Sequence, residues 1–133
     1  MRYLLDSNHA SPLVTLTHPL RQRILESVAS DNLFFIALPV VTEVLFGIGM
    51  LPRARANLEI WQLLQKAFTV LGLTKDDAEF AARIQIEARS RGRQIATVDA
   101  LIAAVALRDD LILLTTDKDF NAIPNLHVEN WLV

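Results

Sequence analysis

The sequence predicts an α/β fold, specifically a three-layer α/β/α sandwich with a mostly parallel central sheet. Short apolar runs alternate with segments whose apolar residues recur at helical spacing, which is the pattern of a parallel sheet covered by helices on both faces. No linker, repeat or low-complexity segment divides the chain of 133 residues. This length is enough to bury one sizeable core, so we assign residues 1–133 to a single domain.

The first strand is expected at residues 3–5, where a brief apolar run stops abruptly at Asp6. A loop follows this strand. Apolar residues at helical spacing then predict a helix over residues 16–29, with Thr15 or Thr17 as its N-cap.

The second strand is expected at residues 33–38, which are apolar and rich in aromatic and branched side chains. Pro39 marks the change from this strand to a helix over about residues 40–46. Gly47 and Gly49 are expected to end that helix, because glycine is a weak helix former.

The middle of the chain predicts two more helices with a strand between them. Pro52 opens a helix that runs to about residue 66, and residues 68–73 form the strand. Thr74 has the position of an N-cap, with an acidic residue three positions later, and the helix that it starts is expected to stop near Gly92.

The last third of the chain contains the most apolar helix. Thr97 starts it, and residues 98–107 are apolar almost all round, which predicts that the helix is buried. Residues 111–114 are expected to form a strand, and the tail at residues 127–133 could add a short one.

Composition excludes several classes of protein. With 13 basic and 15 acidic residues the chain is no polycationic binder, so any contact with nucleic acid must use a local patch. The absence of cysteine excludes disulfides, thiol chemistry and Cys-zinc sites. The longest apolar run, residues 33–41, is too short for a membrane span, and the start lacks the pattern of a signal peptide. We therefore expect a soluble cytoplasmic protein.

Acidic residues occupy a particular place in this pattern, at the ends of strands or the starts of helices. Because parallel strands end at the same edge of a sheet, such residues are expected to lie near one another, in the crevice where α/β proteins bind ligands. The residues concerned are Asp6 after the first strand, Glu43 in about the first turn of the next helix, Asp99 at the start of the apolar helix, and Asp117 and Asp119 after residues 111–114.

Each acid taken alone could be structural. Carboxylates near helix N-termini gain about 0.3 to 1 kcal/mol from the helix dipole, and Asp6 alone would suit a turn or a cap. Asp99, however, leads into the apolar residues 100–106, where an unpaired charge is costly. If Asp6 and Glu43 converge on it, repulsion adds to this cost. Divalent ions that prefer oxygen ligands, Mg²⁺ or Mn²⁺, would offset both effects.

Four motifs, in this order, resemble the PIN-domain ribonucleases, specifically the VapC-type toxins of bacterial toxin–antitoxin pairs. They are residues 3–8, 41–47, 92–104 and 114–120, and residues 123–126 and 129–131 are similar to the end of family members. The resemblance spans nearly the whole chain. It implies a PIN-like fold and a metal-dependent endoribonuclease, a hydrolase that cleaves RNA phosphodiester bonds to leave 5′-phosphate and 3′-hydroxyl ends. It also implies a cognate antitoxin and a homodimer as partners.

The resemblance assigns roles to individual residues. It implies a catalytic site of four carboxylates, with Mg²⁺ or Mn²⁺ held chiefly by three of them and with Glu43 and Asp119 as further candidate ligands. Ser7 and Asn8 are expected to support the ligands. The four predicted catalytic residues are Asp6, Glu43, Asp99 and Asp117, and the three chief metal ligands among them are Asp6, Asp99 and Asp117.

RNA needs cations at the rim of an acidic site. Arg93 is the candidate RNA-binding residue, because it stands closest in sequence to Asp99, whereas Arg89 and Arg91 equally suit a solvated helix end. Among the three histidines, which lack ligand spacing, only His9 is a minor candidate for touching substrate.

An apolar group surrounds the two glycines at positions 47 and 49. Its members could form a surface that a partner covers, or they could pack into the core, and the sequence leaves both open. They are Phe46, Ile48, Met50 and Leu51.

Two other functions compete with the nuclease. A phosphatase of the haloacid dehalogenase type would use Asp6 as nucleophile but needs a second Asp two residues later, where this chain has Asn8. A PIN fold that only binds RNA or antitoxin would be free to lose its acids, and this chain has all four.

Overall fold

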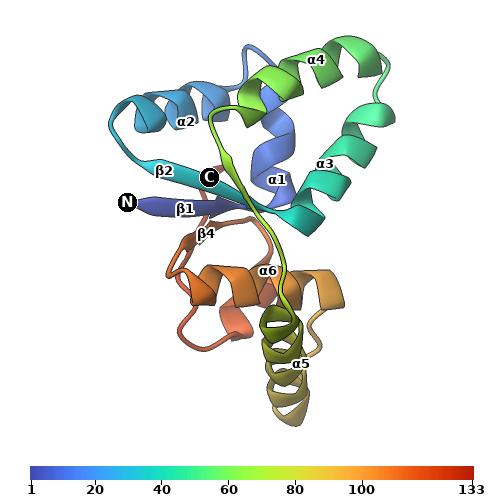
Figure 1. The fold of residues 1–133 in the computed structure, drawn as a ribbon, viewed down its shortest axis with the longest axis vertical. Helices are drawn as coiled ribbons and strands as arrows, with labels where there is room; N and C mark the ends of the chain where they lie inside the picture. Colours follow the sequence, from blue (N-terminus) through green and yellow to red (C-terminus); the bar gives the residue numbers. More distant parts are fainter.

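A five-stranded parallel sheet runs through the centre of the molecule in the order β3-β2-β1-β4-β5 (Figure 1). The computed structural model describes all residues, Met1–Val133. All four strand pairs are parallel, which confirms the predicted fold class. The strands are β1 (Arg2–Leu5), β2 (Leu33–Ala37), β3 (Thr69–Leu71), β4 (Ile112–Leu114) and β5 (Val128–Glu129).

Strand β1 lies in the middle of the sheet because its side chains are apolar and it has a partner on each side. Leu4 pairs with Phe35 of β2 and with Leu113 of β4. Leu4 and Leu5 are both completely buried. The C-terminal end of β1 therefore opens at the centre of the sheet edge, between the ends of β2 and β4.

Helices cover both faces of the sheet, which gives the predicted three layers. Helices α1 to α4 lie on one face, and α5 and α6 lie on the other (Figure 1). No helix has the length and apolar character needed to cross a membrane. The helices are α1 (Ser7–Ala10), α2 (Pro19–Ala29), α3 (Leu38–Gly49), α4 (Ala54–Gln65), α5 (Lys75–Ser90) and α6 (Thr97–Arg108), with short 3₁₀ helices η1 (Ser11–Val14) and η2 (Lys118–Ala122).

The segment after β1 differs from the prediction. Helices α1 and η1 replace the expected loop, and α2 begins at Pro19 rather than at residue 16. The predicted caps Thr15 and Thr17 are wrong, because His18 caps α2 by accepting the Leu20 N–H at Nδ1 over 3.1 Å. Proline is preferred in the first turn of a helix, where its missing N–H has no partner to lose, and this fixes the start at Pro19.

Helix α3 starts earlier and ends later than predicted. It begins at Leu38, directly after β2, and Pro39 stands in its first turn. Gly47 and Gly49 lie inside the helix instead of ending it. Each glycine costs about 1 kcal/mol relative to alanine in a helix.

Burial of one face of α3 outweighs the cost of these glycines. Val40, Val44 and Ile48 recur at helical spacing and are between 0% and 2% exposed. Each such side chain contributes about 1.5 to 3 kcal/mol when fully buried. The earlier start of the helix places Glu43 in the second turn of α3 rather than in the first.

The start of α5 and the burial of α6 are as predicted. The Thr74 hydroxyl accepts the Asp77 N–H (3.2 Å), and the Asp77 carboxylate accepts the Thr74 N–H (2.9 Å), which together form a capping box. Gly92 has a φ of +74°, a conformation that suits glycine at the end of α5. The apolar interior of α6 is buried from Ile102 to Ala106.

Candidate active site

The Asp6 carboxylate stands at the C-terminal end of β1 and is 5% exposed. Its backbone N–H donates to the carbonyl of Leu114 over 3.0 Å, which continues the pairing of β1 with β4. Its Oδ1 accepts the Ser7 N–H at 2.8 Å and so caps α1. Ser7 thus supports Asp6 through its backbone. The sequence-based interpretation of Asp6 as a cap is therefore confirmed. The cap uses only Oδ1, so Oδ2 of Asp6 is free to accept from other donors.

Two side chains hold Oδ2 of Asp6. The Thr115 hydroxyl donates to it at 2.7 Å, and the Asn8 amide Nδ2 donates to it at 3.2 Å. Asn8 thereby lies where the sequence predicted a supporting residue. Thr115 is 2% exposed and was not singled out from the sequence. The feature that could have identified Thr115 from the sequence is its position directly after β4, the strand next to β1.

Asp99 is the third residue of α6, whose N-cap Ala96 offers no side-chain oxygen. The pKa of the Asp99 carboxyl is raised from 3.8 to about 6, first by burial and then by the charges of the four other predicted acids, namely Asp6, Asp117, Glu43 and Asp119 in decreasing order of effect. Charges act on one another mainly over short distances in salt solution, so these effects are consistent with acids that share one region of the surface.

Glu43 reaches the same place from α3. The pKa of its carboxyl is raised, first by loss of hydration and then by the charge of Asp6. The residue as a whole is exposed, while its carboxyl group is partly desolvated against the protein. Its position in the second turn of α3 therefore still brings it toward Asp6.

Asp117 and Asp119 are arranged by the turn that follows β4. The Asp117 N–H donates to the Thr115 hydroxyl at 3.0 Å, and Oδ1 of Asp117 accepts the Asp119 N–H at 2.9 Å, which caps η2. Asp119 is exposed and has the weakest effect of the four acids on Asp99. Asp119 therefore remains the least strongly supported member of the group.

The donor set of this site fits a divalent ion such as Mg²⁺ or Mn²⁺. It offers carboxylate oxygens only, and the raised pKa of Asp99 indicates repulsion that a cation would relieve. In the orientations described, no three acids are grouped closely enough to hold one ion. Glu43 is exposed and Asp117 is half-buried, so solvent reaches both side chains.

The arginines before α6 differ in what they contact. Arg93 and Arg89 are exposed and line a shallow depression together with Gln85. The Gln85 amide donates to the carbonyl of Ile95 (3.0 Å) and to the Thr97 hydroxyl (3.2 Å) at the start of α6. This contact places the depression beside the helix end that presents Asp99.

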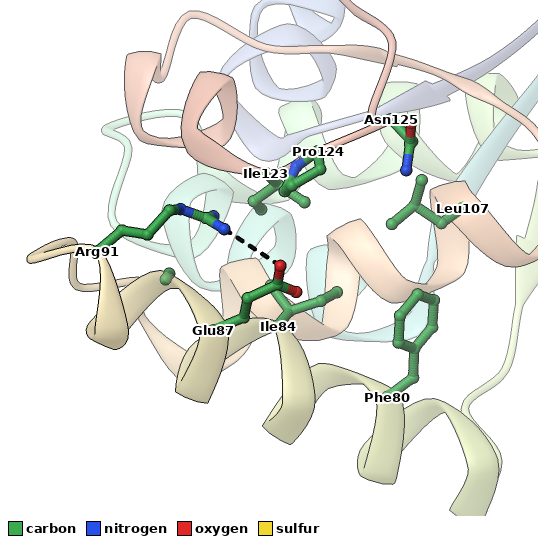
Figure 2. A pocket seen from close by; sticks show the side chains of 9 residues that line it. Phe80, Ile84, Glu87, Arg91, Leu107, Ile123, Pro124 and Asn125 are labelled. Carbon is green, nitrogen blue, oxygen red and sulfur yellow. Dashed lines mark hydrogen bonds and ion pairs between the residues drawn. The ribbon is translucent and has the colours of Figure 1, made fainter.

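Arg91 faces a different part of the molecule. Its guanidinium donates to Glu87 at 3.2 Å (Figure 2). It also donates to the carbonyl of Ala122 at 3.0 Å. These contacts bridge α5 to the end of η2 beside a small pocket that Phe80 and Leu107 also line (Figure 2). Arg91 is therefore committed to a structural contact, which leaves Arg93 as the better candidate for contacting RNA.

The suggestion that His9 touches substrate is wrong, because His9 is completely buried. Its Nδ1 lies 2.8 Å from Oδ1 of Asn8, and its Nε2 accepts the Trp131 N–H at 3.0 Å. Burial, and then the charge of Arg23, lower its pKa from 6.5 to about 4. His9 is therefore a neutral residue behind the site.

The apolar residues around the glycines of α3 were expected either to pack into the core or to form a surface that a partner covers. The structure shows some of each. Ile48 is 2% exposed and belongs to the core. Phe46 and Met50 are 71% and 72% exposed, and Leu51 is also exposed. These three residues therefore form part of an apolar surface along the end of α3.

Comparison with known proteins agrees with this architecture. The chain is 25% identical over 132 residues to Ribonuclease VapC2 of Rickettsia felis, which covers 98% of each chain. It superimposes on VapBC2 of Rickettsia felis bound to a DNA fragment from their promoter with a TM-score of 0.86, 24% identity and coverage of 98% of this chain and 99% of that one. For FitAcB of Neisseria gonorrhoeae the TM-score is 0.77, with 24% identity and 100% of both chains covered. The family model described as PIN domain matches residues 3–126, so this chain belongs to the PIN domain family.

Proposed function

We propose that this protein is the endoribonuclease toxin of a toxin–antitoxin pair and hydrolyses RNA phosphodiester bonds. Its proposed catalytic residues are Asp6, Glu43, Asp99 and Asp117. The observation that carries the proposal is geometric: the Thr115 hydroxyl donates to Asp6 at the end of β1 and accepts the N–H of Asp117 in the turn after β4, which ties these two acids to one place. The raised pKa values of Asp99, in the first turn of α6, and of Glu43, in α3, support the same grouping. The similarity to Ribonuclease VapC2 of Rickettsia felis adds support for a ribonuclease.

In this proposal Mg²⁺ or Mn²⁺ is held by Asp6, Asp99 and Asp117, with Glu43 and Asp119 as further ligands. When bound, the ion lowers the pKa of water and stabilises the negative charge that develops on phosphate oxygens. The protein supplies the arrangement of the ligands.

Asp6 is the fixed reference of the site, because Ser7, Asn8 and Thr115 together give it three hydrogen bonds. Asp99 supplies a half-buried carboxylate from the first turn of α6. With a pKa of about 6, Asp99 is mostly ionised at neutral pH and is able to bind a cation. Glu43 and Asp117 approach from opposite sides, on α3 and on the turn after β4.

We further propose that Arg93 contacts a phosphate of the RNA backbone. It is exposed, and it has no acidic partner among the ion pairs of the structure. Arg93→Gln is expected to raise KM for RNA severalfold and to weaken the dependence of binding on salt. Arg91→Gln is the matched control, because Arg91 is already paired with Glu87, and it should leave KM unchanged. An equal effect of the two changes on KM would contradict this role.

The proposed partners are RNA, a cognate antitoxin and a second copy of the chain. Solved relatives include the VapBC complex of Salmonella typhimurium bound to DNA and a toxin–antitoxin complex from Klebsiella pneumoniae. The exposed side chains of Phe46 on α3 and of Met50 directly after it offer apolar surface for such a protein contact. No membrane is required for this function.

The function is tested by incubating the protein with end-labelled RNAs of defined sequence, with Mg²⁺ or Mn²⁺ and then with EDTA. We expect cleavage that EDTA stops and fragments that carry 5′-phosphate ends. Hydrolysis of a small phosphomonoester without RNA cleavage would instead indicate a phosphatase. If no RNA is cleaved with either metal, the proposal is refuted, and a non-catalytic binding module is the remaining interpretation.

A further inference from the structure

A partly buried chain of hydrogen bonds runs from the C-terminal tail to the acidic site through the fully buried His9. The Trp131 N–H, which can only donate, points at Nε2 of His9 over 3.0 Å. This nitrogen must therefore be unprotonated, and the ring proton must lie on Nδ1. From there it points at Oδ1 of Asn8 over 2.8 Å. The backbone N–H of the tail thus sets the tautomer of His9.

The tautomer of His9 in turn sets the orientation of the Asn8 amide. Oδ1 of Asn8 accepts from His9 and from the Thr116 N–H at 3.2 Å. With the oxygen held on that side, the amide Nδ2 faces Asp6 and the Thr115 hydroxyl, each at 3.2 Å. If the amide turned over, its oxygen would face the Asp6 carboxylate, and two acceptors would repel each other.

The tail that supplies the first donor is firmly seated. The Trp131 ring packs against the Tyr3 ring, with centroids 4.9 Å apart, and the Arg23 guanidinium lies over it at 4.0 Å. The indole N–H donates to Glu129 at 3.0 Å. Tyr3 belongs to β1 itself, so the tail is fixed relative to the strand that carries Asp6.

We propose that His9 is a positioning residue, which transmits the placement of the C-terminal tail at Trp131 through Asn8 to the Asp6 carboxylate. This inference rests on the proposed function of the acidic site and adds a role for a residue outside it. His9 touches neither substrate nor metal. Its contribution is to hold Asn8 in the one orientation that donates to Asp6.

Two matched substitutions separate this role from simple packing. In His9→Asn the side-chain amide can replace Nδ1 as the donor to Asn8, whereas in His9→Gln the longer side chain can replace only Nε2 as the acceptor for Trp131. We expect kcat for RNA cleavage to fall at least tenfold further in His9→Gln than in His9→Asn, with KM for RNA unchanged in both. The affinity for Mn²⁺, measured without RNA, should weaken in the same order.

Melting temperatures show that both variants are folded, and they need not follow the order of kcat. Equal kcat and equal Mn²⁺ affinity in the two folded variants would overturn the inference while leaving the proposed function intact. If the wild type cleaves no RNA, the proposed function fails, and the order of Mn²⁺ affinities still tests His9.

A measurement on the unaltered protein keeps the inference testable if either variant fails to fold. Long-range ¹H–¹⁵N correlation spectra of ¹⁵N-histidine-labelled protein distinguish the two neutral tautomers. We expect His9 to carry its proton on Nδ1 throughout pH 6 to 8, consistent with its low pKa of about 4. A proton on Nε2 would overturn the inference, because Nε2 could then not accept from Trp131.

Discussion

Replacing Asp99 with asparagine should stabilise the metal-free protein, although it removes a carboxylate from the start of a helix. The pKa of Asp99 is raised from 3.8 to about 6 by burial and by neighbouring acids. Its ionised form is therefore less stable in the folded protein than in the unfolded chain. Asparagine has nearly the same shape and carries no charge, so Asp99→Asn removes this penalty.

The size of the effect follows from the raised pKa. Each pKa unit corresponds to about 1.4 kcal/mol, so the full penalty would approach 3 kcal/mol. Asp99 is only half-buried, so solvent screening reduces this figure, and loss of a charge near the N-terminus of α6 costs about 0.3 to 1 kcal/mol. We expect a net gain of about 1 to 2 kcal/mol, or roughly 3 to 8 °C in Tm.

The gain should depend on pH in a defined direction. Between pH 4 and 6 the folded protein holds a proton on Asp99 that the unfolded chain has released, so the stability of the wild type falls as the pH rises through this window. In Asp99→Asn this contribution to the loss of stability with rising pH should be absent. The two proteins should therefore have similar Tm near pH 4, and the variant should melt higher above pH 6.

The assay is thermal unfolding in EDTA from pH 4 to 8. Asp76→Asn is the matched control, because Asp76 is also an acid in the first turn of a helix but lies at the exposed start of α5. It should lose about 0.3 to 1 kcal/mol. If Asp99→Asn lowers Tm at pH 7 as Asp76→Asn does, the acids are separate helix caps and the reasoning is refuted.

The remaining predictions concern a residue that contacts Asp6, a buried ion pair away from the site, and the effect of Mg²⁺ on stability. Thr115→Val removes the hydroxyl that donates to Asp6, so kcat should fall at least tenfold in cleavage assays, while Thr115→Ser should retain most of it. Arg108→Gln leaves the buried Asp77 carboxylate without its cation, and urea unfolding should show a loss of about 1 to 3 kcal/mol. Adding Mg²⁺ should raise Tm of the wild type and change that of Asp99→Asn much less. An unaltered kcat in Thr115→Val would contradict the first prediction, and a wild-type unfolding midpoint in Arg108→Gln would contradict the second. An equal shift of Tm by Mg²⁺ in the wild type and in Asp99→Asn would contradict the third.

The sequence was sufficient to predict the sheet, and it placed the acids beside strand ends and helix starts, because both follow from local patterns. Each strand is a short apolar run, and each acid stands at a position that the alternation of strands and helices places at one edge. The capping box of Thr74 and Asp77 was also visible, since its two residues are three positions apart. These features need no knowledge of distant contacts.

Other features were beyond sequence reasoning because distant contacts decide them. The glycines of α3 favour an end to the helix locally, but burial of Val40, Val44 and Ile48 carries the helix through them. His9 follows the first motif, so the sequence made it a minor candidate for touching substrate. It is in fact buried, and its Nε2 accepts from the N–H of Trp131, which lies 122 positions away in the chain.

The central claim is that the acids at the sheet edge form one metal-dependent site for cleaving RNA. The most direct measurement compares cleavage of one RNA, with Mg²⁺ at saturation, by the wild type, Asp6→Asn, Asp99→Asn and the control Asp76→Asn. We predict that Asp6→Asn and Asp99→Asn lose at least a hundredfold in rate while remaining folded, and that Asp76→Asn cleaves like the wild type. Full activity in Asp6→Asn and Asp99→Asn would contradict the claim.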